Sequence, residues 1–249
     1  EHRASASRAV TVTTAREADL YRQHNPYAAV EVINNGIDLA SFSPRHDVEH
    51  EVERPGCIFV GYLDYRANVI GLQWFCQNVW RELVRIHPGA TFSIVGRNAT
   101  REVRRLESIP GVEVVGSVND VRPLIAGTNI VVVPLLVARG IQNKILEAMA
   151  MGKAVVASPA ALAGIGARPG KEIIEADAPG EWIARIVDLW GDAQRRRQIG
   201  EQARRFVETH HDWRHCLAPL VNMCSGRRVA EKRTASDFST RPRLAGVIG

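Results

Sequence analysis

Short apolar segments alternate with longer amphipathic segments over more than a hundred residues of this chain. Most of the short segments are apolar throughout and stop at a glycine or a proline, which indicates strands that are covered on both faces. The alternation predicts an α/β fold with a doubly wound, Rossmann-like parallel sheet. The expected strands are residues 57–60, 90–95, 112–115, 129–133, 154–157 and 172–175. The expected helices are residues 69–86, 100–108, 119–125, 140–152, 181–190, 193–208 and 213–223.

The regions that flank this regular body have a different composition. Residues 1–30 hold a strand, a short helix and the start of a second strand, and residues 31–56 have the polar, proline-containing composition of an inter-domain linker. Residues 57–224 carry the regular pattern. Residues 225–249 form a basic tail without apolar periodicity, which we expect to be disordered.

The positive charge of the chain is concentrated in its tail. Net charge is +5 at pH 7, and the body is nearly neutral. The basic pI therefore does not indicate a nucleic acid-binding face, and we expect no nucleic acid partner. The alternative is that the tail itself binds nucleic acid or an anionic membrane. No apolar run reaches the ~20 residues that cross a bilayer, and the four cysteines form no CxxC pair, so we expect free thiols rather than a metal site.

The most informative segment is residues 139–158. It predicts a helix that begins at Gly140 and ends at Gly152, followed at once by an apolar strand. At ~100° per residue, Gly140, Lys144 and Glu147 share one stripe of this helix, on its exposed face. A second stripe, which we expect to pack on the sheet, consists of Ile141, Ile145, Ala148 and Met149.

This arrangement suits a nucleotide ligand. The free N–H groups and the positive dipole end of a helix bind phosphate, and a carboxylate further along can accept two hydrogen bonds from the cis-diol of a ribose. The alternative is a solvated Lys–Glu ion pair worth only about 0.2–0.5 kcal/mol. The absence of GxGxxG, GxxxxGK[ST] and GxSxG disfavours a dinucleotide dehydrogenase, a P-loop enzyme and a serine hydrolase.

Polar residues follow several of the expected strands, at the edge of the sheet where ligands of such folds bind. Asp64, Arg66 and Asn68 are candidates to meet a substrate phosphate or hydroxyl; the alternative is a loop with a helix cap. Arg97 carries a planar fork that pairs with two phosphate oxygens, or is simply a surface arginine. These positions belong to residues 61–68, 96–98, 117–119 and 135–140.

Several motifs recur in a fixed order. Phe59-Val-Gly61, Phe92-Ser-Ile-Val-Gly96 and Val114-Val-Gly116 each place a glycine after an apolar strand, and Arg139-Gly-Ile-Gln-Asn-Lys-Ile-Leu-Glu147 opens the helix described above. Together with Trp213, this series resembles the donor-binding domain of retaining GT-B glycosyltransferases, the glycosyl transferase group 1 family, over residues 30–224. The last motif is similar to bacterial sugar transferases of PEP-CTERM/exosortase and exopolysaccharide clusters.

The resemblance implies the C-terminal half of a GT-B fold, with residues 1–30 as a remnant of the N-terminal acceptor domain. It implies a nucleotide-sugar donor, no cofactor and no obligatory metal. Glu147 would hold the ribose hydroxyls, and Glu147, Arg139 and Lys144 are the expected catalytic residues. The other donor-binding positions implied are Gly61, Asp64, Arg66, Arg97, Asn98, Val118, Gly140, Ile141 and Gln142.

Three departures from the family pattern bear on activity. Arg139 stands where the family often has a glutamate, and Tyr62 stands where it has an arginine, for which Lys144 and Arg66 are candidate substitutes. Most of the acceptor domain is absent, so the chain looks like part of a longer protein.

We therefore expect a hexosyltransferase that acts with retention on a polysaccharide or lipid-linked acceptor. The chain alone is expected to bind donor without turnover. The implied location is the cytoplasm, with peripheral association at the inner face of the plasma membrane. The alternative is a non-catalytic nucleotide-sugar-binding module.

Overall fold

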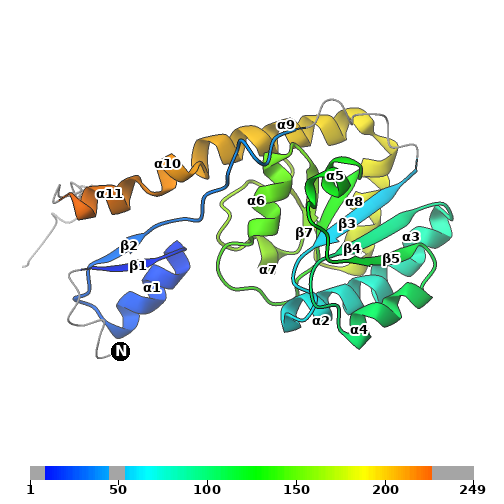
Figure 1. Cartoon of the computed structure of the whole chain (residues 1–249), viewed down its shortest axis with the longest axis horizontal. Coiled ribbons are helices and arrows are strands. Elements are labelled where there is room, and N and C mark those ends of the chain that lie inside the picture. The colour runs from blue at the N-terminus through cyan, green and yellow to red at the C-terminus, as the bar shows by residue number, and fades with distance from the viewer. Residues whose placement is uncertain (1–8, 45–53, 226–249) are drawn as a thin grey trace, which may run out of the picture.

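The computed structural model of the chain describes residues 9–44 and 54–225. Its main sheet has six parallel strands in the order β5-β4-β3-β6-β7-β8 (Figure 1), which confirms the predicted doubly wound architecture. From β3 the chain moves outward to β5 and then returns to β6 on the other side of β3. Ligands of such sheets bind at the carboxyl ends of the strands beside this reversal. The strands are β3 (Gly56–Val60), β4 (Thr91–Val95), β5 (Val112–Gly116), β6 (Ile130–Val133), β7 (Ala154–Ala157) and β8 (Ile174–Glu175).

Helices connect the strands and cover the sheet. α2 contacts α4, and α8 contacts η2, α3 and α9. α6 packs against α9 and β7. The helices of the body are α2 (Arg66–Phe75), η2 (Cys76–Trp80, a π-helical stretch), α3 (Arg81–Ile86), α4 (Arg101–Arg104), η3 (Arg105–Ser108), α5 (Arg122–Ala126), α6 (Asn143–Ala150), α7 (Pro159–Leu162), α8 (Pro179–Gly191) and α9 (Ala193–His210). Two short helices, α10 (Trp213–Cys216) and α11 (Ala218–Cys224), end the described chain. None of the described helices is both long enough and apolar enough to cross a membrane.

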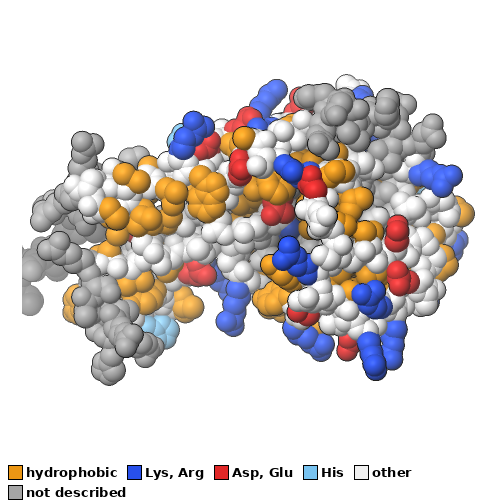
Figure 2. All heavy atoms as spheres, in the orientation of Figure 1, with side chains coloured by type: hydrophobic (Ala, Val, Ile, Leu, Met, Phe, Trp, Pro, Cys, Tyr) orange, Lys and Arg blue, Asp and Glu red, His pale blue; other side chains and the backbone are white. Residues whose placement is uncertain are grey.

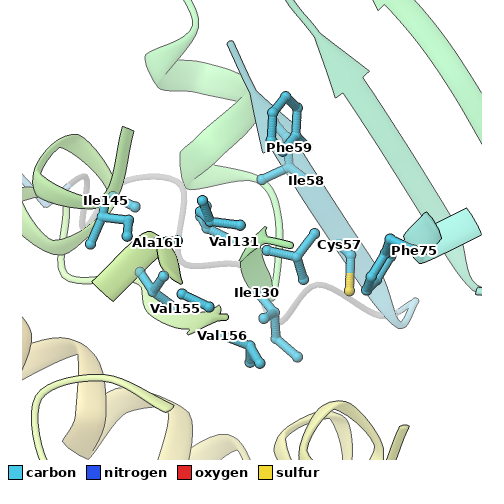
Figure 3. Packing of buried hydrophobic residues seen from close by; sticks show 14 of the residues in the cluster. Cys57, Ile58, Phe59, Phe75, Ile130, Val131, Ile145, Val155, Val156 and Ala161 are labelled. Atoms are coloured by element: carbon cyan, nitrogen blue, oxygen red, sulfur yellow. The ribbon is translucent and has the colours of Figure 1, made fainter. Parts of the chain in front are cut away.

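The core lies between these helices and the sheet. Figure 3 shows Cys57 of β3 facing Phe75 of α2, with Ile130 of β6 alongside. The ring centroids of Phe75 and Phe92 are 5.1 Å apart, and those of Phe75 and Trp182 are 5.5 Å apart. These aromatic pairs join α2, β4 and α8, and all strand residues of β6 and β7 are buried, as the apolar runs predicted.

Three helices begin three residues away from the start that the sequence pattern predicts. The helix expected at residue 119 begins at Arg122. The helix expected at residue 69 begins at Arg66, and no side chain caps its first turn, so the usual start signal is missing. The helix expected at Gly140 begins only at Asn143. Gly140 has φ +64°, a left-handed conformation that cannot belong to a right-handed helix.

A small N-terminal unit lies beside the body. β1 (Val10–Val12) and β2 (Val30–Val32) pair in parallel, and α1 (Ala15–His24) crosses between them. Thr14 and Glu17 form a capping box at the start of α1. The description of this unit as a remnant of an acceptor domain stays a prediction.

The segment that connects this unit to the body is held firmly where the structure describes it. The Ile37 N–H donates to the His211 carbonyl at 2.7 Å, and a Cβ at Gly36 would lie 2.6 Å from the Trp213 ring. Arg204 of α9 donates to the carbonyl oxygens of Phe42 (2.7 Å) and Ala150 (2.6 Å). Residues 34–44 of the expected linker are therefore packed against α9. Residues 45–53 and all but the first residue of the expected tail lie outside the described residues.

Candidate functional site

Three backbone amides are free at the mouth of α6. Gln142 precedes the helix, and its side chain caps no amide; it donates instead to the Arg139 carbonyl at 3.2 Å. Among the described residues, no acceptor is found for the backbone N–H groups of Gly140, Ile141 and Gln142. Free amides at the positive end of a helix attract anions, and phosphate above all. The amides predicted to face a diphosphate are thus available to one.

Lys144 reaches from α6 toward the carboxyl end of β3. Its Nζ donates to Asn68 Oδ1 at 2.7 Å and lies 4.5 Å from the centroid of the Phe59 ring. A Cβ at Gly61 would lie 3.1 Å from this Nζ, so a residue without a side chain is what leaves room for the ammonium. The structure thus brings Gly61 and Lys144 together on the two sides of the strand-order reversal.

Glu147 lies one turn further along α6 and is half-buried. Within the described part of the chain its carboxylate has no hydrogen-bond or salt-bridge partner, Lys144 included. Burial raises the pKa of Glu147, and the charge of Lys144 partly opposes this effect. A solvated Lys–Glu ion pair is therefore not what the helix presents. Desolvated, unpartnered carboxylates are uncommon and mark candidate sites.

Lys144 is itself desolvated. Burial lowers the pKa of its ammonium from 10.5 to about 8, although the Glu147 charge acts to raise it. At neutral pH the lysine is therefore still mostly protonated, and its charge is screened less than that of a surface lysine. A positive charge, three free amides and an unpartnered carboxylate occur together within two turns of chain.

The loops after β3 and β4 approach each other closely. A Cβ at Gly96 would lie 1.6 Å from the Gly61 carbonyl oxygen, so only glycine fits there. The Leu63 N–H donates to the Arg97 carbonyl at 2.8 Å. Asn98, in a left-handed conformation at φ +60°, donates to Asp64 at 2.8 Å. Asp64 and Asn98 are thus paired with each other, which favours a role in shaping the loops.

The remaining candidate residues lie at the surface around this region. The side chains of Arg97, Arg66 and Arg139 are exposed. Hydrogen bonds at the start of α4 and the Arg105 charge lower the pKa of Glu102 in that helix, and the Arg66 charge contributes weakly to this effect. Val118 is half-buried and packs against the core after β5. No described contact joins Arg139 or Val118 to the Lys144–Glu147 cluster.

The sequence pattern singled out Asn68 but did not predict which residue it contacts. Asn68 was expected to meet substrate or to cap a helix, but it is buried and bonded to Lys144. Its partner is 76 positions away in the sequence, so no local spacing indicates the contact. The start of α1 also reaches this region, because a Cβ at Gly140 would lie 3.8 Å from Thr13 Oγ1.

An open groove of about 710 Å³ lies away from this cluster, between residues 166–172 and α9. Its charged side chains are largely paired with one another: Arg168 with Glu172 at 2.6 Å, and Arg205 with Glu201 at 3.8 Å. We therefore place the candidate site at α6, where polar groups lack described partners, and not at the groove beside α9. Among the described residues, no group of three or more His, Cys, Asp or Glu side chains is arranged to hold a metal ion.

Comparison with known proteins finds solved structures with a similar fold. The chain is similar to sucrose-phosphate synthase from Thermosynechococcus elongatus (TM-score 0.72, 20% identity), covering 88% of this chain and 58% of that one. It is similar to Anabaena Alr3699/HepE in complex with UDP and glucose (TM-score 0.70, 17% identity; 88% and 63% covered). It is also similar to a S. aureus TarM variant bound to UDP, Fondaparinux and α-GlcNAc-glycerol (TM-score 0.75, 16% identity; 88% and 44% covered).

These likenesses show the fold, and the six-stranded sheet matches GT-B glycosyltransferase structures. The chain spans about half to two thirds of the length of the structures that it matches. No curated protein matches the sequence. A family model described as "Glycosyl transferases group 1" matches residues 54–192, more than half of the chain. The chain therefore belongs to the group 1 glycosyl transferases.

Proposed function

We propose that this chain is the donor-binding half of a hexosyltransferase that uses a nucleoside diphosphate sugar and retains the anomeric configuration. The acceptor is a polysaccharide or a lipid-linked saccharide, and no metal or cofactor takes part. The observation that carries the proposal is the half-buried Glu147 carboxylate without a described partner, beside the free amides at the mouth of α6. A ribose diol supplies the two hydroxyl donors that this carboxylate lacks.

The same geometry supports a role for the amides at the mouth of α6 and for Lys144 in stabilising the diphosphate as it leaves. In the transfer, the bond between the anomeric carbon and the diphosphate oxygen breaks while an acceptor hydroxyl oxygen bonds to that carbon. Negative charge develops on the departing diphosphate, which takes up the proton that the hydroxyl releases. The amides of Gly140, Ile141 and Gln142 and the Lys144 ammonium stabilise this charge. Lys144 is a better candidate than Arg66 for the role of the missing family arginine, because its Nζ lies beside Gly61, whereas the Arg66 side chain is exposed. The UDP in complexes of similar structures supports a nucleoside diphosphate as ligand.

A second lobe completes the enzyme in this proposal. β1, β2 and α1 form a unit too small to bury an apolar core of its own. Figure 2 shows apolar side chains gathered over this unit and over α10 and α11. Leu20 is 58% exposed and Val221 is 62% exposed. These surfaces suit packing against an acceptor-binding lobe, and the chain alone binds donor without transferring sugar.

Calorimetric titration with UDP and with 2′-deoxy-UDP tests the donor site. We expect wild type to bind UDP roughly tenfold more tightly than the deoxy compound, because one hydrogen bond to a charged group is lost. Glu147→Ala should weaken UDP binding and bring the two ligands within about twofold of each other. Glu113→Ala, at an exposed position of β5, is the matched control and should behave as wild type. Equal loss of both ligands in Glu147→Ala would contradict the assigned role, as would no binding of UDP, GDP or ADP by wild type.

A non-catalytic nucleotide-sugar-binding module is the second candidate. It is favoured by Arg139, which is exposed and stands where the family often has a carboxylate. A polypeptide that includes the acceptor lobe can be assayed for sugar transfer with Arg139 and with Arg139→Glu. Transfer by the natural sequence supports the enzyme, and transfer only after the substitution supports the non-catalytic module.

A further inference from the structure

Asn68 uses both ends of its amide in the interior of the protein. The side chain is 3% exposed and lies in the first turn of α2. Its Nδ2 donates to the Tyr62 carbonyl at 2.7 Å, and its Oδ1 accepts from Lys144 Nζ at 2.7 Å. The Tyr62 bond fixes the amide orientation, because only one of its two orientations lets Nδ2 donate to Tyr62 and Oδ1 accept from Lys144. Lys144 of α6 therefore donates to an acceptor of fixed orientation, Asn68 Oδ1, which belongs to α2.

We infer that Asn68 is a positioning residue that aims the Lys144 ammonium at the donor diphosphate; this inference rests on the proposed function. An ammonium has three N–H donors. In the described part of the chain one of them meets Asn68, while the Phe59 ring and Gly61 border the nitrogen without accepting a conventional hydrogen bond. The other donors remain for oxygen atoms of a ligand.

The chemistry of the acceptor matters as much as its position. A carboxylate at residue 68 would also hold the lysine, but it would cancel the positive charge and repel a diphosphate. An amide holds the ammonium and leaves its charge available. Among the described residues, the charged group that acts on Lys144 is Glu147 of its own helix, and β3 and α2 contribute only the uncharged Phe59, Gly61 and Asn68.

A double-mutant cycle on UDP binding tests this role. We expect Asn68→Ala to weaken UDP binding on the order of tenfold, because the flexible lysine loses its fixed direction. Lys144→Met should weaken binding by at least as much. In the Lys144→Met background, Asn68→Ala should then add less than about twofold, because no ammonium remains to be placed. Asn78→Ala, which removes an exposed asparagine that donates to the Trp74 carbonyl, is the control and should leave binding unchanged.

The pH profile gives a readout that a purely structural asparagine would not move. The diphosphate favours protonated Lys144, whose pKa is about 8, so UDP affinity should fall as pH rises from 7 to 9. Lys144→Met should flatten this profile. The pH dependence that remains in this variant measures the ionisation of UDP itself, and it can be subtracted from the wild-type profile. Asn68→Asp keeps the size of the side chain and places a carboxylate beside the ammonium. We expect it to raise the pKa of Lys144, to weaken binding at pH 7, and to flatten the profile between pH 7 and 9.

The outcomes separate this inference from the proposed function. If wild type binds no nucleoside diphosphate, the proposed function fails. Suppose instead that wild type binds UDP, and that Asn68→Ala weakens UDP binding by the same factor in wild type and in the Lys144→Met background. Asn68 is then structural, and the inference is overturned. The inference is also overturned if the UDP affinity of Asn68→Asp depends on pH in the same way as that of wild type. Asn68→Asp also serves if Asn68→Ala does not fold, which thermal unfolding shows directly.

Discussion

At the scale of single residues, the candidate site is formed at the expense of stability. Burial raises the pKa of Glu147 above 4.5, so the folded chain binds more protons than the unfolded chain in the window above that value. The free energy of unfolding therefore falls as pH rises through this window. We expect Glu147→Gln to unfold with a free energy about 1 kcal/mol higher than wild type at pH 7.5, with a smaller gain at pH 4.5. UDP binding should weaken at the same time.

Chemical denaturation at both pH values measures this difference, and Glu113→Gln is the matched control at an exposed position. A variant that is less stable at pH 7.5 would mean that Glu147 has a structural partner. Helical spacing predicted the buried stripe of α6 correctly, since Ile141, Ile145 and Ala148 are buried. It also placed Lys144 and Glu147 on an exposed face. Both side chains are half-buried. Lys144 is covered because Gly61 and Asn68 lie beside its ammonium, and spacing within one helix cannot predict such contacts between elements.

At the scale of elements, α6 and α9 owe their close contact to one glycine. A Cβ at Gly200 of α9 would lie 1.9 Å from the carbonyl oxygen of Gly152, in the turn after α6. We expect Gly200→Ala to destabilise the chain by about 1–3 kcal/mol, because the backbone must move to relieve the overlap. Gly180 in α8 has no atom within 4 Å of its Cβ position, so Gly180→Ala should be neutral or slightly stabilising. Thermal unfolding of both variants checks this, and equal stability would contradict the packing described.

The strands of the body were predictable and some helix starts were not. Apolar runs that stop at Gly61, Gly96 and Gly116 predicted the first three strands of the main sheet within about one residue. This works because a strand that is buried on both faces consists almost entirely of apolar residues. The start of α6 was wrong by three residues, because a glycine is compatible both with a helix start and with the left-handed loop found at Gly140.

At the scale of the whole molecule, the alternation of strands and helices predicted the doubly wound sheet, and the structure confirms it. The attachment of residues 34–44 to α9 was not predictable. Arg204 holds this segment through carbonyl oxygens of Phe42 and Ala150, and a carbonyl is present at every residue whatever its side chain. A sequence therefore shows that an arginine is present at position 204, but it does not predict which carbonyl oxygens this arginine contacts.

Hydrogen exchange with and without saturating UDP tests the central claim most directly, because it reports where the ligand binds. We predict that UDP slows exchange of the amides in residues 140–147 and in the loop of residues 61–68. Residues 166–172 and 198–210, which border the groove beside α9, should exchange at unchanged rates. Protection confined to that groove, with none at the mouth of α6, would contradict the account.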